Sequence, residues 1–355
     1  MDCPDGSCAL PNLTREQKRK DYETDPANAQ EIWENLRNTI CGIGRGYYTY
    51  SFTTDGIEGQ LHDLWDELIH AVKITPATSA ELDRLVLLLV ETRELGVFAQ
   101  TRNDREEDVA SSTEAPGEVI VSNGKRLWID LPYFAQEVTD SWTTESMRLT
   151  PAQRESLAVW TAKLCATGIC SDDLSRCALW LFKQALETDR PLMEDEQGDS
   201  RDDKENIRPT IHDLLPACLA WLKYNNSKLV KLSQANYTAA PSSDDSNDDD
   251  DMTMPGDLAV KAGVAQPGFS IARWLFWRQR FKDLYRSRAP PVVKLARSCF
   301  DASIFLGMDI GVTVPGERIY LARLFEALDK ELEAREFKGC VDAEEIDIDM
   351  DWDKE

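Results

Sequence analysis

Apolar residues recur at steps of three and four along positions 57–74, from Ile57 through Leu64 to Val72. This spacing places them on one face of an α-helix. A second run with the same period follows at 80–95, and the short connection between the two favours antiparallel packing. The sequence therefore predicts a pair of packed amphipathic helices.

Capping signals predict further helices. Thr150 and Gln153 form a capping box around Pro151, and Gly168 is placed to end the helix that they begin. Ser171 is predicted to cap the next helix. The remaining helices are predicted at about 26–40, 211–232, 269–287, 291–306 and 316–336. The predicted fold class is all-α, an irregular multi-helix globular domain with one small β-hairpin and disordered acidic insertions.

The hairpin is predicted at 119–129. Two β-prone runs, 119–121 and 127–129, flank Asn123-Gly124. An Asn-Gly pair favours a two-residue hairpin turn because both central residues need a positive φ.

Three glycines, Gly42, Gly44 and Gly46, are predicted to end the helix at 26–40. They lack the GxGxxG spacing and the preceding strand of a phosphate-binding loop. We therefore interpret them as a turn.

Most of the net charge of −24 is concentrated in four segments. Segments 101–118, 187–209, 241–257 and 340–355 carry net charges of −4, −5, −7 and −7. Such polar stretches cannot bury enough apolar surface to offset chain entropy. We expect a flexible N-terminus at 1–25 and a single helical domain at 26–337. Disordered loops at 101–118, 187–209 and 238–257 interrupt that domain, and an acidic disordered tail follows at 338–355.

Charge and cysteine content suggest the compartment. The body outside the acidic segments is nearly neutral, which argues against binding to nucleic acid or to anionic membranes. The first residues resemble no signal peptide, and the longest apolar run, 85–90, is too short to span a membrane. We expect a cytoplasmic or nuclear protein, neither secreted nor membrane-spanning, whose nine cysteines are reduced.

Catalytic motifs are not recognised. The chain has three histidines, no GxSxG motif and no CxxC pair, so neither a nucleophile-base set nor a metal site is indicated. The sequence predicts no catalytic residue, no cofactor and no metal.

The segment 273–288 is basic within an acidic chain, with six basic residues and one acid. On a helix its tryptophans share one seam, while basic residues form separate edges. The candidate interaction surface consists of Arg273, Arg278, Arg280, Lys282 and Arg286. One interpretation is a surface for an anionic ligand, an RNA or an acidic partner. The favoured one is a core helix whose arginines pair with acids of neighbouring helices or of the acidic loops, an intramolecular contact.

The tail alternates acids with apolar residues, Ile346, Ile348, Met350 and Trp352. Such a segment is either a short motif that folds on a partner or a solvated tail. The second interpretation is favoured.

Several short apolar stretches, in this order, resemble a family of filamentous-fungal proteins classed as a domain of unknown function. They include Leu64-Trp65, Leu127-Trp128 and the cluster Arg273-Trp274 with Phe276-Trp277. The resemblance extends over about 57–285. It implies an α-helical fold and brings no activity, cofactor or catalytic residue.

Three functional hypotheses remain open. The favoured one is a non-enzymatic protein-interaction or scaffold protein of fungal cells that binds a still unknown protein partner. The second is a small-molecule binder or enzyme with a pocket between helices. The third is a nucleic-acid-associated regulator that uses the basic segment 273–288.

Overall fold

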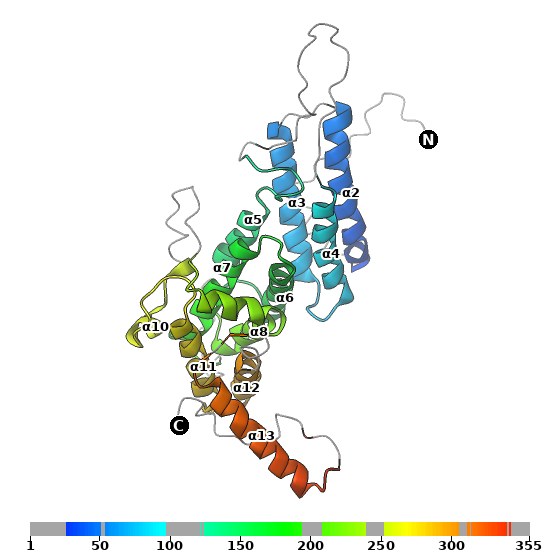
Figure 1. Ribbon diagram of the computed structural model, residues 1–355. Coiled ribbons are helices and arrows are strands. Elements are labelled where there is room, and N and C mark those ends of the chain that lie inside the picture. Colours follow the sequence, from blue (N-terminus) through cyan, green and yellow to red (C-terminus); the bar gives the residue numbers. More distant parts are fainter. Residues whose placement is uncertain are drawn as a thin grey trace, which may run out of the picture. The chain divides into compact units, whose positions relative to one another are not determined.

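The computed structural model (Figure 1) describes residues 26–50, 54–96, 121, 124–193, 208–238, 252–304, 311–312, 314–338 and 341. These residues are mostly helical, and no strand occurs among them. The chain divides into two compact units, Met1–Ser141 and Trp142–Glu355. The predicted all-α class is confirmed, while a single domain over 26–337 stays a prediction.

Much of the sequence predicted to be flexible lies outside the described residues, including 1–25, 101–118, 194–207, 239–251 and 342–355. The inner ends of two predicted loops, however, are part of the described structure. Glu187 and Met252 are fully buried. The prediction of disorder is therefore wrong at these ends of 187–209 and 238–257, because residues there pack into the core.

The first unit contains α2 (Pro26–Tyr50), α3 (Thr54–Ile74), α4 (Ala80–Glu94) and α5 (Phe134–Asp140). α2 contacts α3 and α4, and α3 also contacts α4 and α5; α2, α3 and α4 lie side by side in Figure 1. The predicted apolar face of α3 is at most 1% exposed at Ile57, Leu61, Leu64, Leu68 and Val72. Burying each such side chain contributes roughly 1.5–3 kcal/mol.

The glycine run does not end the first helix as predicted. Gly42, Gly44 and Gly46 lie inside α2, which continues to Tyr50. Ile43 is only 2% exposed and extends the buried stripe beyond Ile40. Packing against α3 and α4 offsets the cost of about 1 kcal/mol that each glycine adds within a helix.

The predicted hairpin is also wrong. Residues 127–129 form turns, and Leu127 and Trp128 are both 1% exposed, whereas a strand would send consecutive side chains to opposite faces. The Asp130 carboxylate accepts hydrogen bonds from the backbone N–H and Nε of Arg126, at 2.8 and 2.9 Å, which closes the turn. Residues 119, 120, 122 and 123 lie outside the described residues.

The second unit contains α6 (Pro151–Thr167), α7 (Ser171–Phe182), η2 (Lys183–Glu187), α8 (Ile211–Gln234), α10 (Asp257–Lys261), α11 (Ile271–Tyr285), α12 (Pro290–Ile304) and α13 (Glu317–Ala334). A π-helical turn, η1 (Ser141–Glu145), precedes them. α8 lies at the centre, since it contacts α6, α7, α11 and α12. The core of this unit is therefore built around α8.

Local capping explains several helix ends. The capping box of Thr150 and Gln153 is present, and Ser79 accepts a hydrogen bond from the Glu81 N–H, as predicted. A similar box joins Thr210 and Asp213 at the start of α8. The prediction for Ser171 is wrong, because this residue is already helical and no side chain caps α7.

α8 is kinked at Asn225. The backbone there is non-helical, with φ −140° and ψ 18°, in the middle of 24 residues that otherwise continue one helix. Asparagine favours such breaks because its side chain competes with the backbone for hydrogen bonds. The kink separates the first turns of α8 from its last ones and shapes the surface described below.

Buried thiols occur on α8 and α12. Cys218 and Cys299 are fully buried, and the Cys299 Sγ lies 3.8 Å from the Leu215 carbonyl oxygen, to which it donates weakly. Burial raises the pKa of both thiols. Both are therefore neutral at physiological pH.

None of the described helices combines the length and the apolar character that a membrane-spanning helix needs.

Candidate functional site

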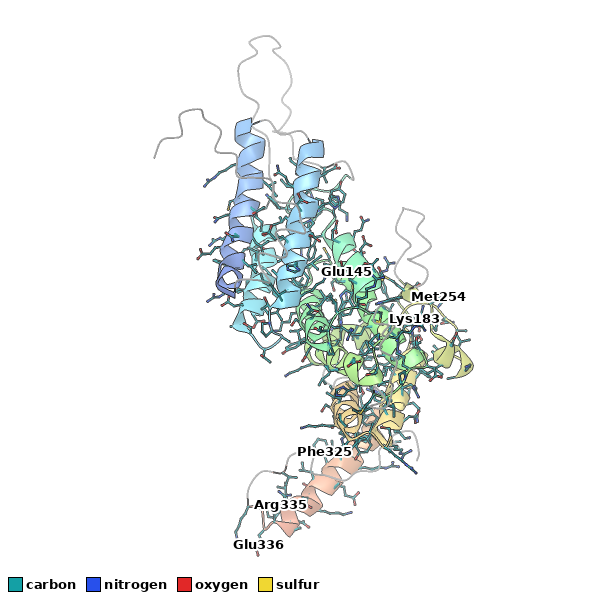
Figure 2. The ribbon with its side chains drawn as sticks, turned by 180° about the vertical axis from the view of Figure 1, so that it is seen from behind. Glu145, Lys183, Met254, Phe325, Arg335 and Glu336 are labelled. Carbon is teal, nitrogen blue, oxygen red and sulfur yellow. The ribbon has the colours of Figure 1, made fainter. Side chains whose placement is uncertain are left out.

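Arg273, the first residue of the predicted surface, is fully buried. Its Nε and Nη2 donate to the two carboxylate oxygens of Glu187 at 2.6 and 2.9 Å. Its Nη1 donates to the carbonyl oxygens of Thr253 and Gly268, each at 2.8 Å, and Nη2 also reaches the carbonyl of Met254, labelled in Figure 2. The guanidinium thus ties η2 and the segment before α10 to α11.

Glu187 accepts two further hydrogen bonds within this buried cluster. The Trp277 Nε1 donates to it at 2.7 Å and the Gly256 N–H at 2.6 Å. A Cβ on Gly256 would lie 2.8 Å from the Glu187 Cβ, so only glycine fits at this position. The carboxylate is therefore satisfied on both oxygens, as a buried charge requires.

Arg278 is buried in the same way on another side of α11. Its Nε donates to the Ser303 carbonyl at 3.1 Å, and its Nη2 donates to the same oxygen and to the Glu317 carboxylate at 3.2 Å. Burial lowers the pKa of Arg278 to about 10, while Glu317 opposes this shift. Arg278 thereby links α11 to the end of α12 and the start of α13.

The other predicted residues differ in exposure. Lys282 is 3% exposed, the Arg280 side chain is one quarter exposed and donates to the Leu186 carbonyl, and Arg286 is exposed. The five residues therefore do not form one continuous exposed surface. The favoured interpretation, pairing with acids of neighbouring elements, describes Arg273 and Arg278; partner binding through Arg280 and Arg286 stays a prediction.

A pocket of about 500 Å³ lies at the kink of α8. One wall is the stretch of α8 around Asn225, and the other is the end of α6, the turn after it and the first residue of α7. Its lining residues are Cys165, Ala166, Gly168, Ser171, Lys223, Tyr224, Asn225, Asn226, Ser227, Lys228 and Lys231.

Gly168 shapes the rim of this pocket. It ends α6 with φ 88°, a left-handed conformation that favours glycine, and this confirms the predicted end of the helix. The next N–H, of Ile169, donates to the Leu164 carbonyl at 3.2 Å. Because this turn is tight, α7 begins close to the end of α6 and brings Ser171 to the pocket.

Three cationic groups belong to the pocket lining, all on the α8 wall. Lys223 and Lys231 are exposed, and neither forms an ion pair with any residue that the structure describes. Lys228 pairs with Asp172 at 2.9 Å, and its side chain remains about one third exposed. The ammonium of Lys223 also lies 5.6 Å from the centre of the Tyr224 ring. The lining contains no carboxylate, and the Asp172 carboxylate next to it is paired with Lys228.

Two buried amides face the same space. Asn225 and Asn226 are 4% and 3% exposed. The Asn226 Nδ2 donates to the Ala302 carbonyl, and its Oδ1 has no hydrogen-bond partner among the described residues. The Asn225 amide interacts with the Cys165 thiol. Both residues line the pocket.

Cys165 closes the inner end of the pocket. Its Sγ donates to the Ser171 carbonyl at 3.2 Å. Burial raises the pKa of the thiol, opposed by Ser171, by the nearby Asn225 amide and by Lys228. The thiol is therefore mainly protonated near neutral pH and is poorly suited to act as a nucleophile.

Another chemistry-bearing pair is His62 with Glu137. In the first unit, the His62 Nδ1 lies 2.5 Å from the Glu137 carboxylate and the ring packs against Tyr133. Within the described ranges, no three His, Cys, Asp or Glu side chains gather as metal ligands would. Among the residues that the structure describes, the pocket is a space lined by lysine and asparagine side chains.

Comparison with known proteins assigns the family. A model described as "Protein of unknown function (DUF3632)" matches residues 65–281. The chain belongs to this family. The DUF3632 match confirms the resemblance seen in the sequence, and it includes every residue of the pocket together with Glu187, Arg273 and Arg278. Glu317, the partner of Arg278, lies beyond it.

A relative of this DUF3632 protein is named "Oxopyrrolidines biosynthesis cluster protein G", from Penicillium oxalicum. It is 27% identical over 252 residues, which are 70% of this chain. The chain spans 64% of the length of that relative. No solved structure matches this chain.

Sequence reasoning did not identify the pocket. One signal was visible: Asn225-Asn226 interrupts a predicted helix, and three lysines lie within six residues of this pair. Adjacent asparagines inside a helix are unfavourable, so they mark a position with another role. No comparable feature of the sequence indicated that α6 and α7 form the other wall of the pocket.

Proposed function

We propose that this protein binds a small, negatively charged molecule in the pocket at the kink of α8. The observation that carries the proposal is the set of Lys223, Lys228 and Lys231 around a space whose lining contains no carboxylate. Lysines held in this way attract carboxylate and phosphate groups. The volume of about 500 Å³ is in the range of small-molecule sites.

The lysines of the pocket lining contrast with the negative net charge of the whole chain. With a formal charge of −24, the protein repels anions at long range. At about 0.1 M salt this repulsion is screened beyond roughly 10 Å. An anion that reaches the pocket therefore responds mainly to the nearby lysines, and binding should weaken as salt rises.

The relative gives the proposal a context. Its printed name refers to a biosynthesis cluster for oxopyrrolidines, which are small cyclic amides. A small acid as the ligand of this chain would agree with a role in the metabolism of small molecules. Because the chain spans 64% of that relative, a shared role of the whole proteins is part of the proposal.

The test is isothermal titration of the full chain with citrate and with inorganic phosphate, at low and at physiological ionic strength. The pocket variant carries Lys223→Gln, Lys228→Gln and Lys231→Gln. The matched control carries Lys261→Gln, Lys294→Gln and Lys330→Gln, three lysines outside the pocket lining, and changes the net charge equally. We expect binding of at least one anion by the wild type and the control, and a loss of at least about tenfold in the pocket variant. Equal binding by both variants would overturn the proposal.

The hypothesis of a protein-interaction or scaffold protein stays a prediction. Its best structural support is the end of α13. Among the described residues, none after Leu324 is buried. Beyond it, Phe325, labelled in Figure 2, is 56% exposed and Phe337 is 71% exposed. These side chains do not define the chemistry of a partner, so the pocket carries the stronger argument.

A further inference from the structure

We infer that the Asp172 carboxylate competes with the anionic ligand for Lys228 and thereby sets the affinity of the pocket. This inference rests on the proposed function, because the lysines are taken to bind the anion. It adds a residue outside the pocket lining and assigns to that residue the regulation of the same site.

The first step concerns the position of Asp172. It is the second residue of α7 and follows Ser171, which belongs to the pocket lining. Its Oδ1 lies 2.9 Å from the Nζ of Lys228, on α8. Because α7 begins in one wall of the pocket and α8 forms the other, this ion pair joins the two walls.

The second step concerns the kind of contact. A carboxylate oxygen about 2.7–2.9 Å from an ammonium nitrogen makes a charge-assisted hydrogen bond, and a ligand carboxylate would bind Lys228 in the same way. Lys223 and Lys231 differ from Lys228, since they form no ion pair with any residue that the structure describes. One of the three cations is therefore already neutralised by a carboxylate of the protein itself.

The third step concerns the reach of the two charges. Burial raises the pKa of the Cys165 thiol, Asp172 adds to this rise, and Lys228 opposes it. Cys165 belongs to the pocket lining, so the charges of both side chains act on the wall of the pocket. An anion bound at Lys228 would lie close to the Asp172 carboxylate, and the two like charges would repel each other.

The fourth step concerns the exchange of one anion for another. The Asp172 side chain is 63% exposed and that of Lys228 is 32% exposed. Ion pairs with this degree of exposure contribute little to stability. The Asp172 carboxylate can turn to solvent without leaving a charge buried in the protein, so a ligand can displace it.

The test measures the binding of citrate and of inorganic phosphate to the full chain by calorimetry at low ionic strength. Asp172→Asn removes the competing charge and keeps the size of the side chain. We expect this variant to bind at least one of the two anions about threefold more tightly than the wild type does. Thermal unfolding checks that the variant is folded.

Asp173→Asn is the matched control. Asp173 lies in the same first turn of α7, is exposed, and forms no ion pair with any residue that the structure describes. The substitution changes the net charge of the chain by the same amount, so it reproduces any long-range effect. We expect its affinity for both anions to stay within about 1.5-fold of the wild type, because salt screens distant charges.

A second comparison places the effect at Lys228. In a chain that carries Lys228→Gln, the further change Asp172→Asn releases no cation, so we expect no gain in affinity from it. A gain of the same size in this background would overturn the inference. Weaker binding by Asp172→Asn than by the wild type would also overturn it, because the carboxylate would then support the anion site.

The outcomes also separate this inference from the proposed function. If Asp172→Asn binds no more tightly than Asp173→Asn while the triple lysine variant loses binding, the anion site stands and the role of Asp172 is rejected. If neither the wild type nor Asp172→Asn binds citrate or phosphate, the proposed function fails together with the inference.

Discussion

Two groups of cations in the second unit have opposite surroundings. The guanidinium groups of Arg273 and Arg278 are buried and bonded to carboxylates and carbonyls, whereas Lys223 and Lys231 are exposed and form no ion pair with any residue that the structure describes. Arginine suits the first situation because its planar fork donates in several directions at once. The comparison teaches that Arg273 and Arg278, which stand out in the sequence, hold the fold together, while the less conspicuous Lys223 and Lys231 remain exposed.

The largest expected effect follows from removing the charge of Glu187. In Glu187→Gln, Arg273 stays buried without its countercharge, which costs about 3–5 kcal/mol of unfolding free energy. Urea unfolding followed by tryptophan fluorescence measures the loss. Glu333→Gln, at an exposed position of α13, should leave the unfolding midpoint unchanged. A midpoint for Glu187→Gln equal to the wild type would contradict a structural role of the pair.

A double variant sharpens this result. When Glu187→Leu is combined with Arg273→Met, neither charge remains buried, so the loss should be smaller than the sum of the two single losses. Strict additivity would mean that the two side chains do not interact.

A smaller effect on stability is expected when an arginine is replaced by lysine or a lysine by arginine. Arg278→Lys cannot keep all three bonds to Ser303 and Glu317, and should cost about 1–3 kcal/mol. Lys231→Arg, the reverse change at the pocket, should leave stability unaltered because the side chain is exposed. Thermal unfolding of both variants decides the comparison; a loss in the second variant would show that the pocket lysine also supports the fold.

The smallest expected effect concerns an ion pair of intermediate exposure, Arg126 with Asp130. The hydrogen bond from the Arg126 side chain lowers the pKa of Asp130 from its ordinary 3.8 to about 2. A carboxyl whose pKa is lower in the folded state stabilises fully above pH 3.8, and this contribution is lost as the pH falls towards 2. Both side chains are about one third or more exposed, so screening limits the contribution to less than about 1 kcal/mol.

The measurement for this pair is the difference in unfolding free energy between wild type and Asp130→Asn, taken from pH 5 down to pH 2.5. We expect the difference to shrink as the pH falls below 4. A difference that is constant over this range would contradict a lowered pKa of Asp130 in the folded state.

Local signals predicted local structure well. Three features depend only on residues within one turn, so they can be predicted directly from the sequence. They are the capping box at Thr150, the cap at Ser79 and the end of α6 at Gly168. The failures required information from elsewhere in the fold. The glycines of α2 are helical because α3 and α4 pack against that helix, and no residue within the run announces those neighbours.

The burial of Arg273, Arg278 and Lys282 within the candidate surface has a similar cause. Helical periodicity separated Arg278 and Lys282 from the tryptophan seam of α11, but it could not tell which side meets solvent. α12 packs against α11, and its Ser303 carbonyl accepts from Arg278, so a second side of the helix is also buried. The pocket escaped notice because its two walls are far apart in the sequence, around Gly168 and around Asn225.

The buried thiols of Cys218 and Cys299 can report on the opening of the second unit. Alkylating reagents attack thiolates that they can reach, so exposed Cys41 is open to labelling in the native chain while these two are shielded. Cys218 and Cys299 can be labelled only when the second unit opens. The rate of labelling would therefore depend on how often this unit opens. A ligand that holds the two walls of the pocket together should slow this reaction, and mass spectrometry of the labelled chain would record the delay.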